Sequence, residues 1–229
     1  MWKRVLITMI IISLYTNFEI MASNNTDSNQ YNIIKSIAPY ILNGENIEVN
    51  RRDCISVLMK LIGVDKLTAD MYAGIDYDQP VFKDISGSVE NDGYIIIAKF
   101  NDVAKGIENN SNIINSFEPD RYVTVKECLT FMLRCLKDSD VVEWDNVMLD
   151  SVRIGLLQED ELEFYVADAP LQNKQFYTLL HRMLDKKRYL YWPIDDPSDG
   201  YAKSMQVDKT NSIRYINWIL ENNKGLFNY

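Results

Sequence analysis

The sequence predicts an all-α protein of three tandem helix-loop-helix modules followed by a C-terminal helix. The main evidence is a helix start that recurs after Asn50, Thr124 and Gln172. Apolar residues follow each start at the spacing of one helical face, and several polar residues coincide as well. Amphipathic helices share an apolar face by chance, but they seldom share caps and polar positions too. We therefore interpret the three segments as an internal repeat.

Residues 1–22 have the order of a secretory signal peptide, with Lys3 and Arg4 before an apolar run at 5–15 and Ala22 before a polar stretch. The apolar run is shorter than the roughly 20 residues that span a bilayer. The sequence thus predicts cleavage, export and no stable transmembrane span. An uncleaved N-terminal anchor stays open as the alternative, because Ile20, three residues from the cut, is not small.

The recurring helix start carries its own capping chemistry. Thr124 and Glu127 form a T-x-x-E capping box, in which each side chain bonds the backbone N–H of the other residue. Weaker versions are Asn50 with Asp53 and Gln172 with Gln175. Apolar residues before the caps can pair with the fourth helical residues as hydrophobic staples: Val49 with Cys54, Val123 with Cys128, and Leu171 with Phe176.

The agreement continues along each helix. The apolar positions are 54/128/176, 55/129/177, 58/132/180, 61/135/183 and 62/136/184. The shared polar positions are Ser56/Thr130/Thr178 and Lys60/Arg134/Arg182. Each helix therefore offers one buried face and a basic residue near its C-terminal end, where the helix dipole favours positive charge.

An upstream helix precedes each main helix. We place the first module and its linker at 28–80, the second module at 81–143 and the third at 144–186. The first module is truncated, with a helix at about 31–42. The second has a helix with apolar Ile96, Phe100, Val103 and Ile107, and the third is compressed and degenerate. We expect Gly106 and Gly155 to end the upstream helices as C-terminal caps.

Residues 187–229 form an aromatic, turn-rich linker and an amphipathic helix over about 209–222. The apolar face of this helix consists of Ile213, Ile216, Ile219 and Leu220. Two interpretations are open. The helix packs back on the bundle, or it docks to a protein partner.

Composition excludes several classes of function. The 229 residues are 47% hydrophobic and 25% charged, as in globular proteins, and the formal net charge of −9 argues against nucleic acid as a partner. Three cysteines without a C-x-x-C spacing favour neither a disulfide scaffold nor a metal site. The single histidine, His181, leaves no base for a Ser-His-Asp triad. No catalytic constellation is recognised, and we expect a protein that is not an enzyme and has no cofactor or metal.

The ordered combination of short motifs resembles the S-layer homology family over residues 31–186. The matching stretches are FKDI, GI, FEPD and VTVKE in the second module, VNRRD in the first and LQNKQ in the third. The resemblance implies three main helices packed about a pseudo-threefold axis. It also implies a bacterial cell-wall or cell-surface location, with secondary cell-wall polysaccharide, often pyruvylated, bound in grooves between modules.

A basic residue at the first helical position opposes the helix dipole, which points to anion recognition by the side chain and free backbone N–H groups. That position is Arg51 in the first module, but Val125 and Asn173 in the others. Carried over residue by residue, the glycan contacts are Arg51, Asp53, Asp84, Thr124, Glu127 and Asp145.

Each of these assignments has a structural alternative. Arg51 is either a ligand contact or an ordinary solvated arginine. Asp84 and Asp145 are ligand contacts or caps of the first helix or turn in their modules. We predict that Trp144 belongs to the core rather than to a sugar-stacking platform.

The sequence therefore predicts an exported, non-enzymatic cell-surface protein that binds wall polysaccharide non-covalently. The alternative is a degenerate helical scaffold that has lost glycan binding and mediates protein interactions at the cell envelope.

Overall fold

The computed structural model describes residues 30–42, 47–107, 115–136 and 142–186, together with the backbone of two strands at 188–192 and 203–207. The predicted signal peptide at 1–22 and the predicted C-terminal helix at 209–222 lie outside the described residues.

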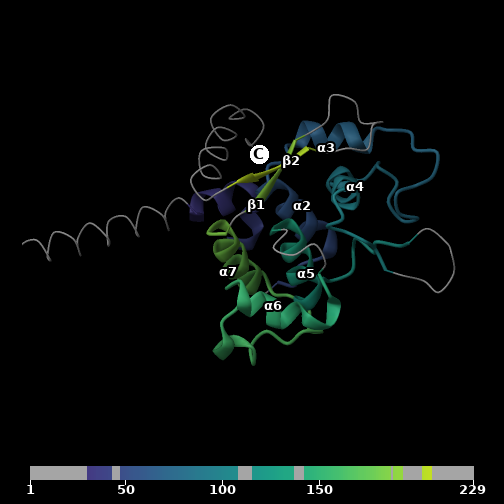
Figure 1. The fold of residues 1–229 in the computed structure, drawn as a ribbon. Coiled ribbons are helices and arrows are strands. Elements are labelled where there is room, and N and C mark those ends of the chain that lie inside the picture. Colours follow the sequence, from purple (N-terminus) through teal and green to yellow (C-terminus); the bar gives the residue numbers. More distant parts are fainter. Residues whose placement is uncertain are drawn as a thin grey trace, which may run out of the picture.

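The described body is helical, in agreement with the all-α prediction (Figure 1). Helix α2 packs against α5 and α4, α4 packs against α3, and α5 packs against α6. Residues 30–37 are also helical, and the short helix η1 that follows them packs against α7. The bounds are η1 Pro39–Leu42, α2 Arg51–Leu61, α3 Lys66–Ala73, α4 Asp92–Phe100, α5 Val125–Leu136, η2 Trp144–Asn146, α6 Val147–Arg153, η3 Glu159–Glu161 and α7 Asn173–Leu184.

A two-stranded antiparallel hairpin lies in the region predicted to be a linker. Strand β1 (Arg188–Trp192) pairs with β2 (Lys203–Val207), with Arg188 opposite Val207 and Trp192 opposite Lys203. Aromatic residues favour strands, and the sequence of β1, RYLYW, is rich in them. The two strands are thus an addition to helices in the part of the chain that the structure describes.

The predicted starts of α2, α5 and α7 are confirmed. Asn50 accepts the Asp53 N–H at 2.7 Å, and Thr124 Oγ1 accepts the Glu127 N–H at 3.2 Å. The reciprocal bonds of the capping box are also present, from the Thr124 N–H to Glu127 at 2.9 Å and from the Gln172 N–H to Gln175 at 3.0 Å. Local chemistry was sufficient to place these starts.

The predicted apolar face is buried at fourteen of its fifteen positions, and Tyr177 is partly buried against the same core. The shared hydroxyl residues also behave alike, since each donates to the carbonyl four residues earlier. The donors are Ser56 at 2.7 Å, Thr130 at 2.7 Å and Thr178 at 3.2 Å.

The upstream helices end differently in the second and third segments. Gly155 caps α6 as predicted, with φ 75° and a bond from the Leu156 N–H to the Ser151 carbonyl at 2.8 Å. The prediction for Gly106 was wrong. Helix α4 stops at Phe100, and Asp102, with φ 59°, takes the left-handed position instead. Asparagine and aspartate also tolerate that conformation, so a nearby glycine was a misleading signal.

Helix α3 was not predicted. Asp65 caps it by accepting the Thr68 N–H at 2.7 Å. The helix packs closely on α4, where a Cβ added at Gly93 would lie 1.8 Å from the Ala69 carbonyl oxygen. Gly93 therefore permits the contact between the two helix backbones.

Three backbone hydrogen bonds join the segments that precede α2, α5 and α7. Val49 N–H donates to Leu171 at 2.9 Å, Leu171 N–H donates to Val123 at 2.8 Å, and Val123 N–H donates to Val49 at 2.9 Å. Each segment donates to one neighbour and accepts from the other, so the three bonds close a ring.

None of the helices in the described segments is both long enough and apolar enough to cross a membrane.

Candidate functional site

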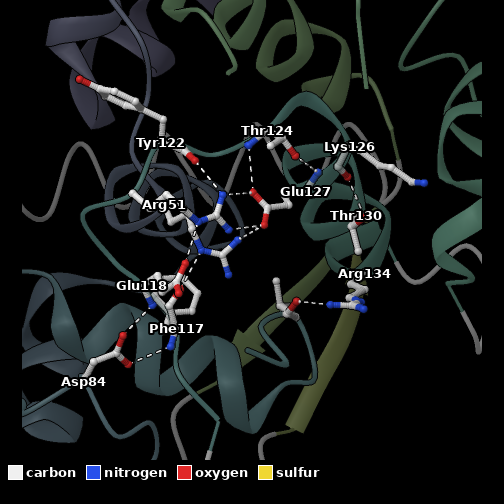
Figure 2. Close-up of polar contacts among 12 residues, drawn as sticks. Arg51, Asp84, Phe117, Glu118, Tyr122, Thr124, Lys126, Glu127, Thr130 and Arg134 are labelled. Carbon is white, nitrogen blue, oxygen red and sulfur yellow. Dashed lines mark hydrogen bonds and ion pairs between the residues drawn. The ribbon is translucent and has the colours of Figure 1, made fainter. Parts of the chain in front are cut away.

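Arg51, the first residue of α2, is built into the interior (Figure 2). Only 3% of the residue is exposed. Its Nε donates to the Phe117 carbonyl at 2.8 Å, and its Nη1 pairs with Glu127 at 2.6 Å. The guanidinium carbon lies 4.6 Å from the centre of the Phe117 ring and 5.4 Å from that of Phe131. The alternative of an ordinary solvated arginine is therefore wrong.

Glu127 accepts hydrogen bonds from Arg51 and from two neighbouring donors. One carboxylate oxygen accepts from Arg51 at 2.6 Å and from Arg121 at 2.6 Å, while the other accepts the Thr124 N–H at 2.9 Å. Burial alone raises the pKa of Glu127, but the hydrogen bond from Arg121, the charge of Arg51 and the Thr124 N–H together lower it below its usual value. The carboxylate therefore stays ionised between two cations.

Asp84 stabilises the loop that contains Phe117, whose carbonyl accepts a hydrogen bond from Arg51. Its carboxylate accepts from the Ser116 hydroxyl at 2.7 Å and from the N–H groups of Phe117 at 2.8 Å and Glu118 at 2.7 Å. Partial burial opposes ionisation, yet these bonds lower the pKa of Asp84. Glu118 has φ 56°, so the bonds also fix an uncommon backbone turn. This geometry matches the turn-capping alternative for Asp84.

Asp53 and Asp145 lie apart from this network. Asp53 belongs to the cap of α2, where its carboxylate also accepts from the Asn50 side-chain amide at 3.0 Å, and burial raises its pKa. Asp145 is exposed on η2. The structure thus brings together four of the six predicted residues, Arg51, Asp84, Thr124 and Glu127.

The first residues of α2, α5 and α7 share one environment although their chemistry differs. Arg51, Val125 and Asn173 are all buried. Their N–H groups donate to loop carbonyls of Arg121 at 2.9 Å, Ala169 at 3.0 Å and Ile47 at 2.8 Å, respectively. The amides expected to be free for an anion are therefore used within the fold. Glycan contact by Arg51 stays a prediction, and its observed contacts are internal.

Lys126 and Trp144 form a surface pair that the sequence analysis did not assign (Figure 2 shows Lys126 pointing away from Glu127). The Lys126 ammonium lies 4.6 Å from the centre of the Trp144 ring, which is a cation–π distance. Trp144 is 48% exposed, so the prediction that it belongs to the core was wrong. In the described part of the chain, no carboxylate pairs with Lys126.

The backbone explains how this pair is placed. Lys126 is the second residue of α5, and its N–H donates to the Ala167 carbonyl at 2.9 Å, which ties the helix start to the loop before α7. Trp144 opens η2, which leads into α6. A basic residue one position after the expected site, with a tryptophan opening the next segment, was the available sequence signal.

No protein-family model matches this chain, and no curated protein matches it.

The low pKa values of Glu127 and Asp84 predict a stability that depends on acid pH. A carboxylate whose pKa is lower in the folded state stabilises the fold above its unfolded pKa, about 4.3 for Glu and 3.9 for Asp, and the stabilisation is lost as pH falls through the folded value. We expect the free energy of unfolding, measured in urea, to decline from about pH 5 downward.

Substitution of Glu127 distinguishes the contribution of this carboxylate from the general effect of acid pH on stability. Glu127→Gln should lower stability at pH 7 and flatten the decline below pH 5, whereas Glu163→Gln, at an exposed carboxylate, should leave the profile unchanged. Parallel pH profiles for the wild type and Glu127→Gln would contradict the assignment.

Proposed function

We propose that this protein is an exported bacterial surface protein of three divergent S-layer-homology-like modules that binds carboxylate-bearing wall polysaccharide non-covalently. The three modules are related by a pseudo-threefold axis through the segments that precede α2, α5 and α7. The observation that carries the proposal is the closed ring of hydrogen bonds through Val49, Leu171 and Val123. Successive donation around a ring is what three equivalent segments about one axis produce.

Hydrogen bonds at the starts of the main helices also support a pseudo-threefold arrangement of the modules. The N–H groups of Arg51 and Arg52 donate to the loop before α5, and those of Val125 and Lys126 donate to the loop before α7. The N–H of Asn173 completes the cycle by donating to Ile47, before α2. The first N–H groups of each main helix thus donate to the loop that precedes another main helix. These bonds form three interfaces between modules.

The interface between the second and third modules has the chemistry to hold an anionic sugar. An exposed indole face packs well against the C–H face of a sugar ring, and an adjacent ammonium attracts a carboxylate. Lys126 and Trp144 supply both groups within 4.6 Å. At the first interface, by contrast, Arg51 is already paired with Glu127.

The test is sedimentation of the full chain with purified bacterial sacculi, before and after chemical removal of the secondary polysaccharide. We expect binding only to unstripped sacculi. Lys126→Ala and Trp144→Ala should each weaken it about tenfold or more, about 1.4 kcal/mol. The matched control is Lys174→Ala, because Lys174 is exposed at the same position of α7 and no aromatic contact to it is described.

The second candidate is a helical scaffold that no longer binds glycan and mediates protein interactions at the cell envelope. The internal pairing of Arg51 favours it, because the residue that would recognise an anion is used to hold two segments together. Absence of wild-type sedimentation with unstripped sacculi would contradict glycan binding and favour this candidate.

A further inference from the structure

Two cysteine thiols lie near each other in the buried core of the protein. Cys54 and Cys128 each occupy the fourth position of a main helix, in α2 and α5. Both are free thiols and fully buried, and Cys128 lies close enough to Cys54 to raise the pKa of its thiol after the larger effect of burial. The equivalent position in α7 is Phe176, which is also fully buried.

The backbone accounts for this proximity independently of the thiols. The bond from the Val123 N–H to the Val49 carbonyl, 2.9 Å long, joins the chain five residues before each cysteine. From there, each cysteine lies one turn into its helix, and α2 packs against α5. Cys54 and Cys128 hold the same position in two adjacent helices. The backbone bond before the helices therefore brings the two side chains to the same height in the core.

We propose that Cys54 and Cys128 are a covalent modification site, at which they form an intramolecular disulfide between the first and second helix-loop-helix segments. The two Sγ–H bonds break, two protons leave, and one Sγ–Sγ bond forms. The two electrons reduce the disulfide of an oxidant, such as oxidised glutathione or a disulfide-bearing oxidoreductase, to two thiols.

Cys135 is not a competing partner within its own helix. It lies seven residues after Cys128 on α5, which is about 10 Å along the helix axis. A disulfide needs Cα atoms about 4.4–6.8 Å apart. In the proposed pairing Cys135 stays a thiol, and the odd number of cysteines in the chain is compatible with one disulfide.

Burial determines when the bond forms. Thiol–disulfide exchange requires the thiolate, and burial raises the pKa of the Cys54 thiol. Thiol–disulfide exchange is therefore fast during folding, before the core buries the two cysteines, and slow in the folded, reduced protein. Once formed, the bond closes a loop from residue 54 to residue 128, and long loops gain the most from a cross-link.

The experiment starts from the full chain, reduced and unfolded in urea, and refolds it by dilution into a glutathione redox buffer. Native reduced protein is held in the same buffer in parallel. Remaining thiols are blocked with N-ethylmaleimide under denaturing conditions, and trypsin then separates the three cysteines into peptides 53–60, 127–134 and 135–137.

Mass spectrometry should find peptides 53–60 and 127–134 linked, with the blocking group on Cys135. The link should form faster in the refolding sample than in the native one. We expect the oxidised protein to melt about 5–15 °C higher than the same protein after reduction. The control variant Cys135→Ser should keep both the link and the melting shift, while Cys54→Ser should lack the link.

Blocking groups on both Cys54 and Cys128 in refolded and native samples would overturn the proposal, as would a link that includes Cys135. Neither readout requires a glycan. A failure of the polysaccharide assay therefore leaves this inference intact, and the reverse also holds.

Discussion

Arg51→Ala is expected to lower the free energy of unfolding by about 3 kcal/mol, measured by urea denaturation at pH 7. The substitution removes a buried guanidinium that pairs with Glu127 and donates to the Phe117 carbonyl. It leaves that carbonyl without its donor and opens a space between the rings of Phe117 and Phe131. Glu127 keeps its bonds from Arg121, which places the effect at the lower end of the range for broken buried pairs.

The control for Arg51 is Arg153→Ala. The Arg153 side chain is 59% exposed and lies 3.4 Å from Asp150 one turn away, an arrangement worth less than about 0.5 kcal/mol. A wild-type unfolding curve for Arg51→Ala, combined with loss of sedimentation on sacculi, would contradict the structural role. That result would favour the ligand-contact role that the family resemblance implies.

Gly93→Ala is expected to destabilise the protein by about 3 kcal/mol or more, because the packing of α3 on α4 has no room for a methyl group. Alanine is favoured over glycine in helices by only about 1 kcal/mol. An added Cβ would lie 1.8 Å from the Ala69 carbonyl oxygen and 2.5 Å from its carbon. These are backbone atoms, so relief requires movement of a whole helix, and the clash outweighs the gain in propensity.

Gly74→Ala is the matched control at the end of α3. Its backbone φ is −83°, and an added Cβ would meet the Asp70 carbonyl oxygen at 3.5 Å, an ordinary contact. We expect a change between zero and a stabilisation of about 1 kcal/mol. Equal urea midpoints for Gly93→Ala and Gly74→Ala would show that α3 and α4 separate without cost, contrary to this packing.

The helix starts show how much of the fold is readable from local sequence. The Thr124–Glu127 box involves atoms three residues apart, so its geometry depends on local backbone alone. The same holds for the Asn50 cap and for Gly155. Helix α3 was missed although Asp65 carries an N-cap signal, because its eight residues form too short a pattern to stand out.

The candidate site was predicted less well than the fold. Arg51 was expected to face an anion, but its partners Phe117 and Glu127 are 66 and 76 residues away in the chain. Trp144 was assigned to the core because aromatic side chains are usually buried. Its exposure beside Lys126 follows from how η2 sits against the start of α5.

The sequence by itself determined where the three main helices begin and which face of each is apolar. These properties depend on caps and on a 3.6-residue period, both of which involve neighbours within a few residues. Only the tertiary structure decided that Val49, Leu171 and Val123 close a ring, that Arg51 is buried, and that Cys54 and Cys128 lie near each other in the core. The reason is physical: an amphipathic helix specifies that one face will be buried, but the atoms that cover it come from distant segments, and their positions depend on how all the helices pack together.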